Sequence, residues 1–180
     1  MIELAKTEIK SKWKCLSSMG VVQMDMGNLK GNNNFNLAFK DYSDINDKDG
    51  QIYYYSNMAA LSSILGNNEN AVRMVEQSIK LLESKNEISH ALLNNYINYA
   101  MTLKAINQHD DRIVPLIDKA IDYAQRLNDS ESEARCHMLL AEIFSDRKQQ
   151  ERSRVSLKKA ITNYKSTNNF MQQGYICHAS

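Results

Sequence analysis

The chain has 180 residues, of which 43% are hydrophobic and 24% are charged, and its formal net charge is +1. A net charge so close to zero lacks the excess of positive charge that direct binding to nucleic acid or to an anionic membrane surface requires. One proline and six glycines are too few for the many tight turns of an all-β sandwich or barrel. The hydrophobic content is that of an ordinary globular protein, which argues against wholesale disorder.

Three features that bear on where a protein resides are a transmembrane helix, a signal peptide and paired cysteines. No apolar run approaches the roughly 18 residues of a transmembrane helix, so we expect no membrane insertion. Residues 1–8 lack the basic and apolar regions of a signal peptide. Cys15, Cys136 and Cys177 are odd in number and show no CxxC spacing, so neither a disulfide framework nor a metal site is predicted. We therefore expect a cytoplasmic protein.

Two series of small residues recur along the chain at spacings of 39 to 42 residues. The first series consists of Gly20, Ala59, Ala100 and Ala141, and the second of Ala38, Ser78, Ala120 and Ala160. Apolar or small residues stand mostly 7 and 3 residues before, and 1 and 4 residues after, each member of the second series. These offsets describe one face of an α-helix. The pattern predicts four helix pairs, in which the small residues let the two helices of a pair approach closely.

In chain order, the four copies are expected at residues 11–48, 50–86, 88–127 and 130–167. Residues 1–9 resemble the end of a preceding helix, and residues 169–180 the start of a fifth pair. In the first copy, the run Gly31–Asn34 disfavours a helix, so its second helix is expected to begin late, with a loop over 27–37 as the alternative. We expect a single repeat domain over 1–180 that is a segment of a longer protein; a complete protein with unusual capping helices is the alternative.

Two details of the helices are also predicted. Ser130 and Glu133 have the spacing of a capping box, with Ser130 as the N-cap of the first helix of the fourth copy. In the run Tyr53–Tyr55, successive residues point about 100° apart around a helix. Tyr55 is expected in the core, Tyr53 on the partner-facing side and Tyr54 on the outside.

The copies resemble the tetratricopeptide repeat, whose first helix carries a large residue, a small pair and an aromatic residue. The corresponding residues of the four first helices are Leu16, Met19, Gly20 and Gln23; Tyr55, Met58, Ala59 and Ser62; Tyr96, Tyr99, Ala100 and Leu103; and His137, Leu140, Ala141 and Phe144. Those of the second helices are Gly31, Phe35 and Ala38; Ala71, Val75 and Ser78; Ile113, Ile117 and Ala120; and Ser153, Leu157 and Ala160. The period of about 40 exceeds the usual 34 or so, and the closing proline is missing.

This resemblance implies an all-α fold, a right-handed α-solenoid of stacked antiparallel helix pairs. Longer repeats of this kind are similar to the arrays of bacterial signalling and regulatory proteins. The family implies a non-catalytic module that binds a protein or peptide on the concave face, which the first helices line. A structural assembly scaffold that forms a homodimer and holds no diffusible ligand is the alternative.

The candidate partner-binding residues occupy the concave positions of the first helices. They are Tyr53, Asn57, Asn94, Asn98, Met101, Lys104 and Arg135. An asparagine carboxamide both donates and accepts hydrogen bonds, so it is able to pair with the backbone of an extended peptide. The alternative is that these carboxamides bond to nearby helix carbonyls or face water.

Nothing in the sequence indicates catalysis or a cofactor. The chain contains no GxGxxG, Walker A, GxSxG or HExxH motif. The pairs Cys136–His137 and Cys177–His178 recur 41 residues apart, which the repeat explains without a thiol–imidazole site. His137 shares the packing position of Tyr55 and Tyr96, so we expect a buried structural histidine there.

Overall fold

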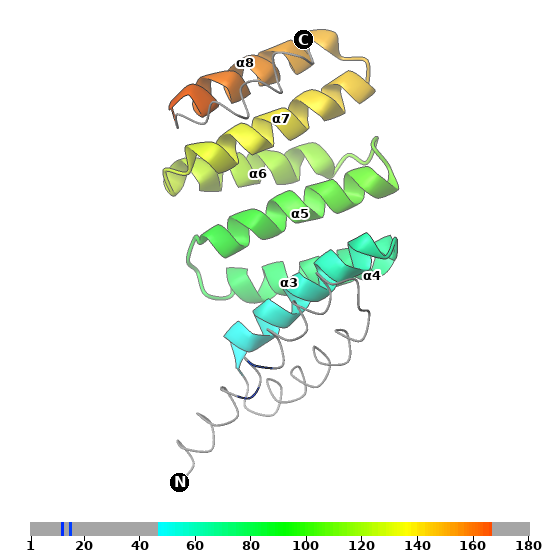
Figure 1. Cartoon of the computed structure of the whole chain (residues 1–180), viewed down its shortest axis with the longest axis vertical. Coiled ribbons are helices and arrows are strands. Elements are labelled where there is room, and N and C mark those ends of the chain that lie inside the picture. Colours follow the sequence, from blue (N-terminus) through cyan, green and yellow to red (C-terminus); the bar gives the residue numbers. More distant parts are fainter. Residues whose placement is uncertain (1–11, 13–14, 16–46, 167–180) are drawn as a thin grey trace. The chain divides into compact units, whose positions relative to one another are not determined.

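The computed structural model describes Lys12, Cys15 and residues 47–166, and between residues 47 and 166 the regular elements are six α-helices with no strand (Figure 1). The helices are α3 (Lys48–Ile64), α4 (Asn68–Glu83), α5 (His90–Ile106), α6 (Ile113–Arg126), α7 (Ser130–Asp146) and α8 (Gln150–Ser166). The predicted all-α fold class is confirmed. The expectations for residues 1–9, 27–37 and 169–180, and for nearly all of the first copy, lie outside the described residues.

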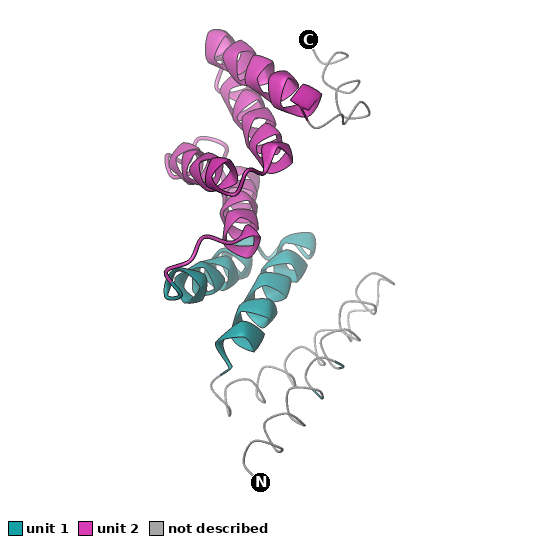
Figure 2. Ribbon diagram, turned by 90° about the vertical axis from the view of Figure 1, so that its left-hand side faces the viewer, with its two compact units in different colours: residues 1–85 teal, residues 86–180 magenta. Residues whose placement is uncertain are grey.

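The chain divides into two compact units, residues 1–85 and 86–180 (Figure 2). In the first unit, α3 packs against α4. In the second, α5 packs against α6, α6 against α7, and α7 against α8. Short turns join these helices, so each one runs antiparallel to the neighbour it packs against. The single domain over 1–180, the handedness and the period of about 40 residues stay predictions.

The described small residues of both series, from Ala59 onward, are buried, and two of them take part in contacts within the helix pairs. Ser78, Ala120 and Ala160 have no exposed surface, and neither has Ala100. In the last pair, the buried Ser153 Oγ of α8 donates a hydrogen bond to the Ala141 carbonyl oxygen of α7 at 2.8 Å. In the first described pair, the hydroxyls of Ser56 in α3 and Ser78 in α4 are 2.8 Å apart. The approach is therefore close enough in α7–α8 for a side chain of one helix to bond to the backbone of the other, and in α3–α4 for two short hydroxyl side chains to meet.

Side chains that precede the helices fix several of their first turns. Asn67, Ser89 and Asp129 each accept a hydrogen bond from the backbone N–H three residues later, at 3.2, 3.2 and 2.9 Å. Such N-caps satisfy donors that the helix itself leaves unpaired. The turns that follow α3, α4 and α6 contain Gly66, Asn86 and Asn128 at φ of 73°, 53° and 54°, the left-handed conformation that Gly and Asn adopt most readily.

The predicted capping box at Ser130 is wrong, because Asp129 is the N-cap of α7. Its carboxylate accepts from both the backbone N–H and the hydroxyl of Ser132, at 2.9 and 2.7 Å. Burial acts to raise the pKa of Asp129, but these hydrogen bonds and the neighbouring His90 hold it below its ordinary value. Glu133 instead accepts a hydrogen bond from Gln125 Nε2 of α6 at 2.8 Å, which ties two helices together.

The prediction for Tyr54 is also wrong. Its side chain is only 8% exposed, while Tyr55 is half-buried and Tyr53 is 38% exposed. The rings of Tyr54 and Tyr55 meet edge to face with centroids 5.4 Å apart. Long side chains bend back over the preceding turn of a helix, so neighbouring residues come into contact although their Cα–Cβ bonds diverge.

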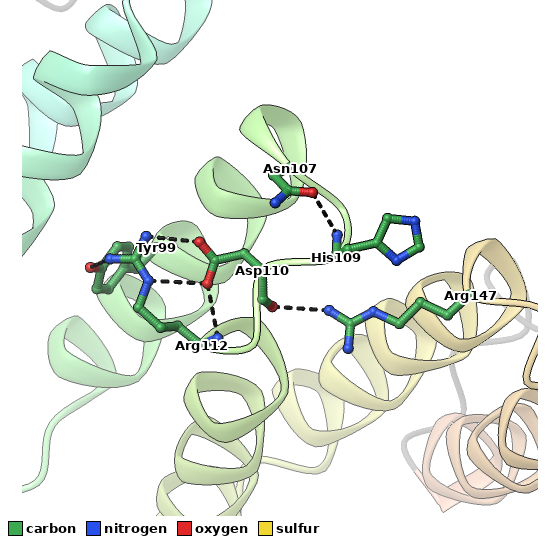
Figure 3. Close-up of polar contacts among 6 residues, drawn as sticks. All are labelled: Tyr99, Asn107, His109, Asp110, Arg112 and Arg147. Atoms are coloured by element: carbon green, nitrogen blue, oxygen red, sulfur yellow. Dashed lines mark hydrogen bonds and ion pairs between the residues drawn. The ribbon is translucent and has the colours of Figure 1, made fainter.

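An arginine network holds the turn between α5 and α6 against the end of α7 (Figure 3). Asp110 accepts hydrogen bonds from the backbone N–H, Nε and a terminal nitrogen of Arg112, at 2.9, 3.0 and 2.8 Å, and these bonds lower the pKa of its carboxyl. Arg112 also donates to the Tyr99 hydroxyl at 3.3 Å. Arg147 donates to the carbonyl oxygens of Gln108 and Asp110, at 3.1 and 2.9 Å. The network therefore links consecutive helix pairs of the second unit.

Enlarging a contact residue should separate the paired helices. Ala100→Leu places a large side chain where there is no exposed surface, so we expect the free energy of unfolding in urea to fall by about 1–3 kcal/mol. Ala105→Leu is the matched control, because Ala105 lies on the same helix and is exposed. Equal stability of the two variants would contradict close packing at Ala100.

Candidate functional site

A hollow of about 430 Å³ lies in the second unit, between α5 and α7. It is lined by Ile97 and Met101 of α5, by Arg135, Met138, Leu139 and Glu142 of α7, and by Tyr164 of α8. Met101 and Arg135 are among the candidate partner-binding residues, and except for Tyr164 the other lining residues also belong to the first helices α5 and α7. The hollow is therefore built mainly from the predicted face.

The spacing of the lining residues explains why they share one surface. Ile97 and Met101 are one helical turn apart, and the four residues of α7 follow one another at intervals of three, one and three. Residues three or four apart lie on the same side of a helix. Ile97, Leu139 and Tyr164 are 3%, 9% and 1% exposed and form the floor, while Met101 is 50% exposed and lies on the rim. The hollow thus has a buried apolar floor and an accessible edge.

The two cationic side chains beside the hollow, Lys104 and Arg135, differ in their ion pairs. Lys104 Nζ of α5 lies 2.7 Å from Glu142 Oε2 and 3.8 Å from Asp146 Oδ2, so it bridges α5 and α7. The exposed Arg135 has no ion pair among the residues that the structure describes. The hollow therefore offers one lining cation, Arg135, that has no carboxylate of the described chain within ion-pair distance.

The structure brings together only part of the candidate set. Met101 and Arg135 line the hollow, and Lys104 is attached to it through Glu142. Asn94 and Asn98 lie on α5 with exposed side chains, and neither carboxamide has a hydrogen-bond partner within the described ranges. These two asparagines remain available to a partner.

The other two candidates lie on α3, in the first unit. Asn57 Nδ2 donates a hydrogen bond to the Tyr53 carbonyl oxygen at 2.8 Å. For Asn57, the structure therefore has the bond to a nearby helix carbonyl that was the alternative to peptide binding. Its binding role, like that of Tyr53, stays a prediction.

Tyr164 is the lining residue that sequence reasoning missed. It stands on a second helix, four residues after Ala160, and second helices were assigned to the side away from the partner. Its side chain is long enough to reach the hollow from α8, and only 1% of it is exposed. The signal available in the sequence was the tyrosine shared by Tyr42 and Tyr164 at the same repeat position.

A second, larger hollow of about 910 Å³ lies between α6 and α8, over α7. His137, Lys159 and Asn163 line it. In the preceding repeat, the equivalent positions hold Tyr96, Lys119 and Tyr123. There, the two tyrosine rings pack edge to face at 5.6 Å, and Lys119 Nζ lies 4.6 Å from the centre of the Tyr96 ring. His137 and Asn163 therefore stand where the preceding pair has an aromatic contact between two tyrosines.

His137 is buried, as expected, with 5% of its surface exposed. Its Nε2 lies 3.7 Å from Glu133 Oε1, and its Nδ1 has no hydrogen-bond partner in the described part of the chain. Burial lowers the pKa of His137 and the nearby Lys159 lowers it further, whereas Glu133 and Asp118 act in the opposite direction. The neutral imidazole is therefore the stable form at neutral pH.

The described residues give no indication of metal or membrane chemistry. No group of three or more His, Cys, Asp and Glu side chains among them is arranged to hold a metal ion. None of the described helices is both long and apolar enough to cross a membrane.

No protein-family model matches the chain, and no curated protein matches its sequence. Solved structures do match its fold. BtubC (BKLC) from P. vanneervenii is 18% identical, with a TM-score of 0.79 over 95% of this chain and 74% of that one. A signal transduction ATPase with numerous domains (STAND) and a tetratricopeptide repeat sensor, from Pyrococcus horikoshii, is 14% identical, with a TM-score of 0.82 over 92% of this chain and 26% of that one. The chain thus has an all-helical fold like that of tetratricopeptide repeat proteins.

The buried imidazole makes stability depend on pH. An unfolded histidine takes up a proton below a pKa of about 6.5, whereas folded His137 takes it up only at lower pH, so acid favours unfolding. We expect the free energy of unfolding to fall from pH 7 to pH 5 less in His137→Phe than in the wild type. His109→Phe changes an exposed histidine and should follow the wild type. Parallel curves for wild type and His137→Phe in urea titrations would contradict this account.

Cys136 should be chemically inert in the folded protein. Burial raises the pKa of its thiol to about 12, and it has no exposed surface. Since the thiolate is the reactive species, iodoacetamide at pH 8 should leave Cys136 unmodified while labelling the exposed Cys15. Mass spectrometry of peptides from the native and the urea-denatured chain measures this, and Cys136 should be labelled only after denaturation. Equal labelling of both thiols in the native chain would show that α7 is not buried at Cys136.

Proposed function

We propose that this chain is a protein- or peptide-binding module without catalytic activity, and that the partner lies along the face formed by α5 and α7. The observation that carries the proposal is the hollow between these helices, which has a buried apolar floor and the exposed Met101 on its rim. The exposed Asn94 and Asn98 stand on the same helix, each three residues before a lining residue. Binding sites combine apolar walls with a few polar groups that fix orientation, and this face has both.

Each part of the face would contribute a different interaction. The floor of Ile97, Leu139 and Tyr164 excludes water and favours an apolar side chain of the partner. Asn94 and Asn98 stand one turn before Ile97 and Met101 on α5, so their carboxamides would pair with the main chain on either side of that side chain. The ion pair of Lys104 with Glu142 links α5 to α7 beside the hollow.

The wider role that we propose is regulatory or sensory, within a larger cytoplasmic signalling protein of bacterial type. Its support is the fold shared with the STAND protein, of which this chain spans about a quarter. A fold is shared by many functions, so this part of the proposal rests on analogy.

A scaffold that assembles through homodimers is the second candidate. It is favoured by the apolar residues at the turn between α3 and α4, since Ile64 is 79% exposed and Leu65 is 53% exposed. Light scattering across a concentration series distinguishes the two: a dimer that Ile64→Asp dissociates supports the scaffold, and a strict monomer supports the binding module.

The binding face is tested by selecting a displayed library of random twelve-residue peptides on the whole chain. We expect Met101→Asp to weaken the selected peptides at least tenfold in fluorescence anisotropy, because a charge on the rim is desolvated by an apolar ligand. Val155→Asp is the matched control: Val155 of α8 is also a helical residue with 50% exposure, but it lines the other hollow. Selection of no peptide, or of peptides that bind both variants like the wild type, would contradict the proposal.

A further inference from the structure

The charge at the α5–α7 hollow indicates which partner it selects. The inference rests on the proposed function, because it concerns the same face. Of the two cations there, Lys104 is held by Glu142 and lies near Asp146. Arg135 lines the hollow and is exposed, with no ion pair among the described residues. Glu131, one turn earlier on α7, is therefore not an ion-pair partner of Arg135. Within the described chain, Arg135 is thus the cation lining the hollow that has no carboxylate within ion-pair distance.

The position of that charge matters as much as its sign. Arg135 shares the hollow with Met138 and Leu139, which follow it by one turn, and with Tyr164 from α8. A side chain that fills the apolar floor would therefore be held within reach of the guanidinium. A guanidinium pairs with a carboxylate through two parallel hydrogen bonds, which gives direction as well as attraction. An apolar side chain and a carboxylate are required together.

We propose that the hollow binds a partner segment that carries a bulky apolar residue with an Asp or Glu within two residues of it, and that Arg135 is the residue that selects the acid. In an extended segment, residues two apart point to the same side, so the apolar side chain and the carboxylate both face the hollow. The occupant is an acidic–apolar peptide segment of another protein. Basic segments are disfavoured by Arg135, and purely apolar segments leave its charge unpaired.

The test repeats the peptide selection on the wild type, on Arg135→Glu and on Arg154→Glu. The wild type should select a bulky apolar residue with Asp or Glu within two positions, and Arg135→Glu should select Lys or Arg in place of the acid. The best wild-type peptide should bind Arg135→Glu at least tenfold more weakly, and replacing its acid by Lys should restore binding to that variant. Arg154 is an exposed arginine of α8 that lines neither hollow, so Arg154→Glu should behave like the wild type.

Two further variants keep the test informative. Arg135→Lys retains the charge and should keep the preference for acidic peptides with lower affinity. Arg135→Gln should lose this preference without reversing it. Arg135→Gln also provides the test if Arg135→Glu fails to fold. A consensus without an acid, together with unchanged binding to Arg135→Glu, overturns the role of Arg135. If such peptides still lose affinity with Met101→Asp, the proposed function survives; if Met101→Asp has no effect either, both fail. Self-association that Arg135→Glu abolishes overturns the inference in favour of a second copy of this chain.

Discussion

The close approach of two helices at small residues is the constraint on which the other features depend. Ala100, Ala120 and Ala160 have no exposed surface, and Ser153 reaches the backbone of α7 directly. Because only small side chains fit between the two helices of a pair, the large side chains lie on either side of the helix–helix contact. There they face neighbouring pairs or the hollows. The floor of the α5–α7 hollow contains two such side chains, Ile97 and Leu139, which stand three and two residues before Ala100 and Ala141.

The same repeat framework produces different surfaces in consecutive copies. Tyr96 and Tyr123 meet edge to face in the α5–α6 pair. His137 and Asn163 hold the equivalent positions in the last pair, and there a hollow of about 910 Å³ is present. Substitution at a few positions therefore changes the shape and charge of a face while the helix contacts are kept.

Features with a helical period were the predictable part of this structure. The positions of Ala59, Ala100 and Ala141, the all-α class and the burial of His137 follow from residue spacing, because spacing decides which side of a helix is covered. The choice of Asp129 over Ser130 as N-cap depends on one hydrogen-bond geometry, which neighbouring residues of similar type do not reveal. The same holds for the hollow: Met101 and Arg135 were found from their register, but Tyr164 was not, because its length carries it across from a second helix. The partner of Lys104 depends on how α5 and α7 are spaced, which no local pattern specifies.

Among the described residues, the Arg147 side chain donates to two main-chain oxygens of the turn between α5 and α6, those of Gln108 and Asp110. Every residue type carries a carbonyl oxygen, so this contact recognises the path of the turn rather than its side chains. A substitution of Gln108 would therefore leave this acceptor in place, whereas a substitution of Asp110 would remove the carboxylate that Arg112 binds. Within one turn, one residue contributes only its main chain to the link between helix pairs and another contributes its side chain as well.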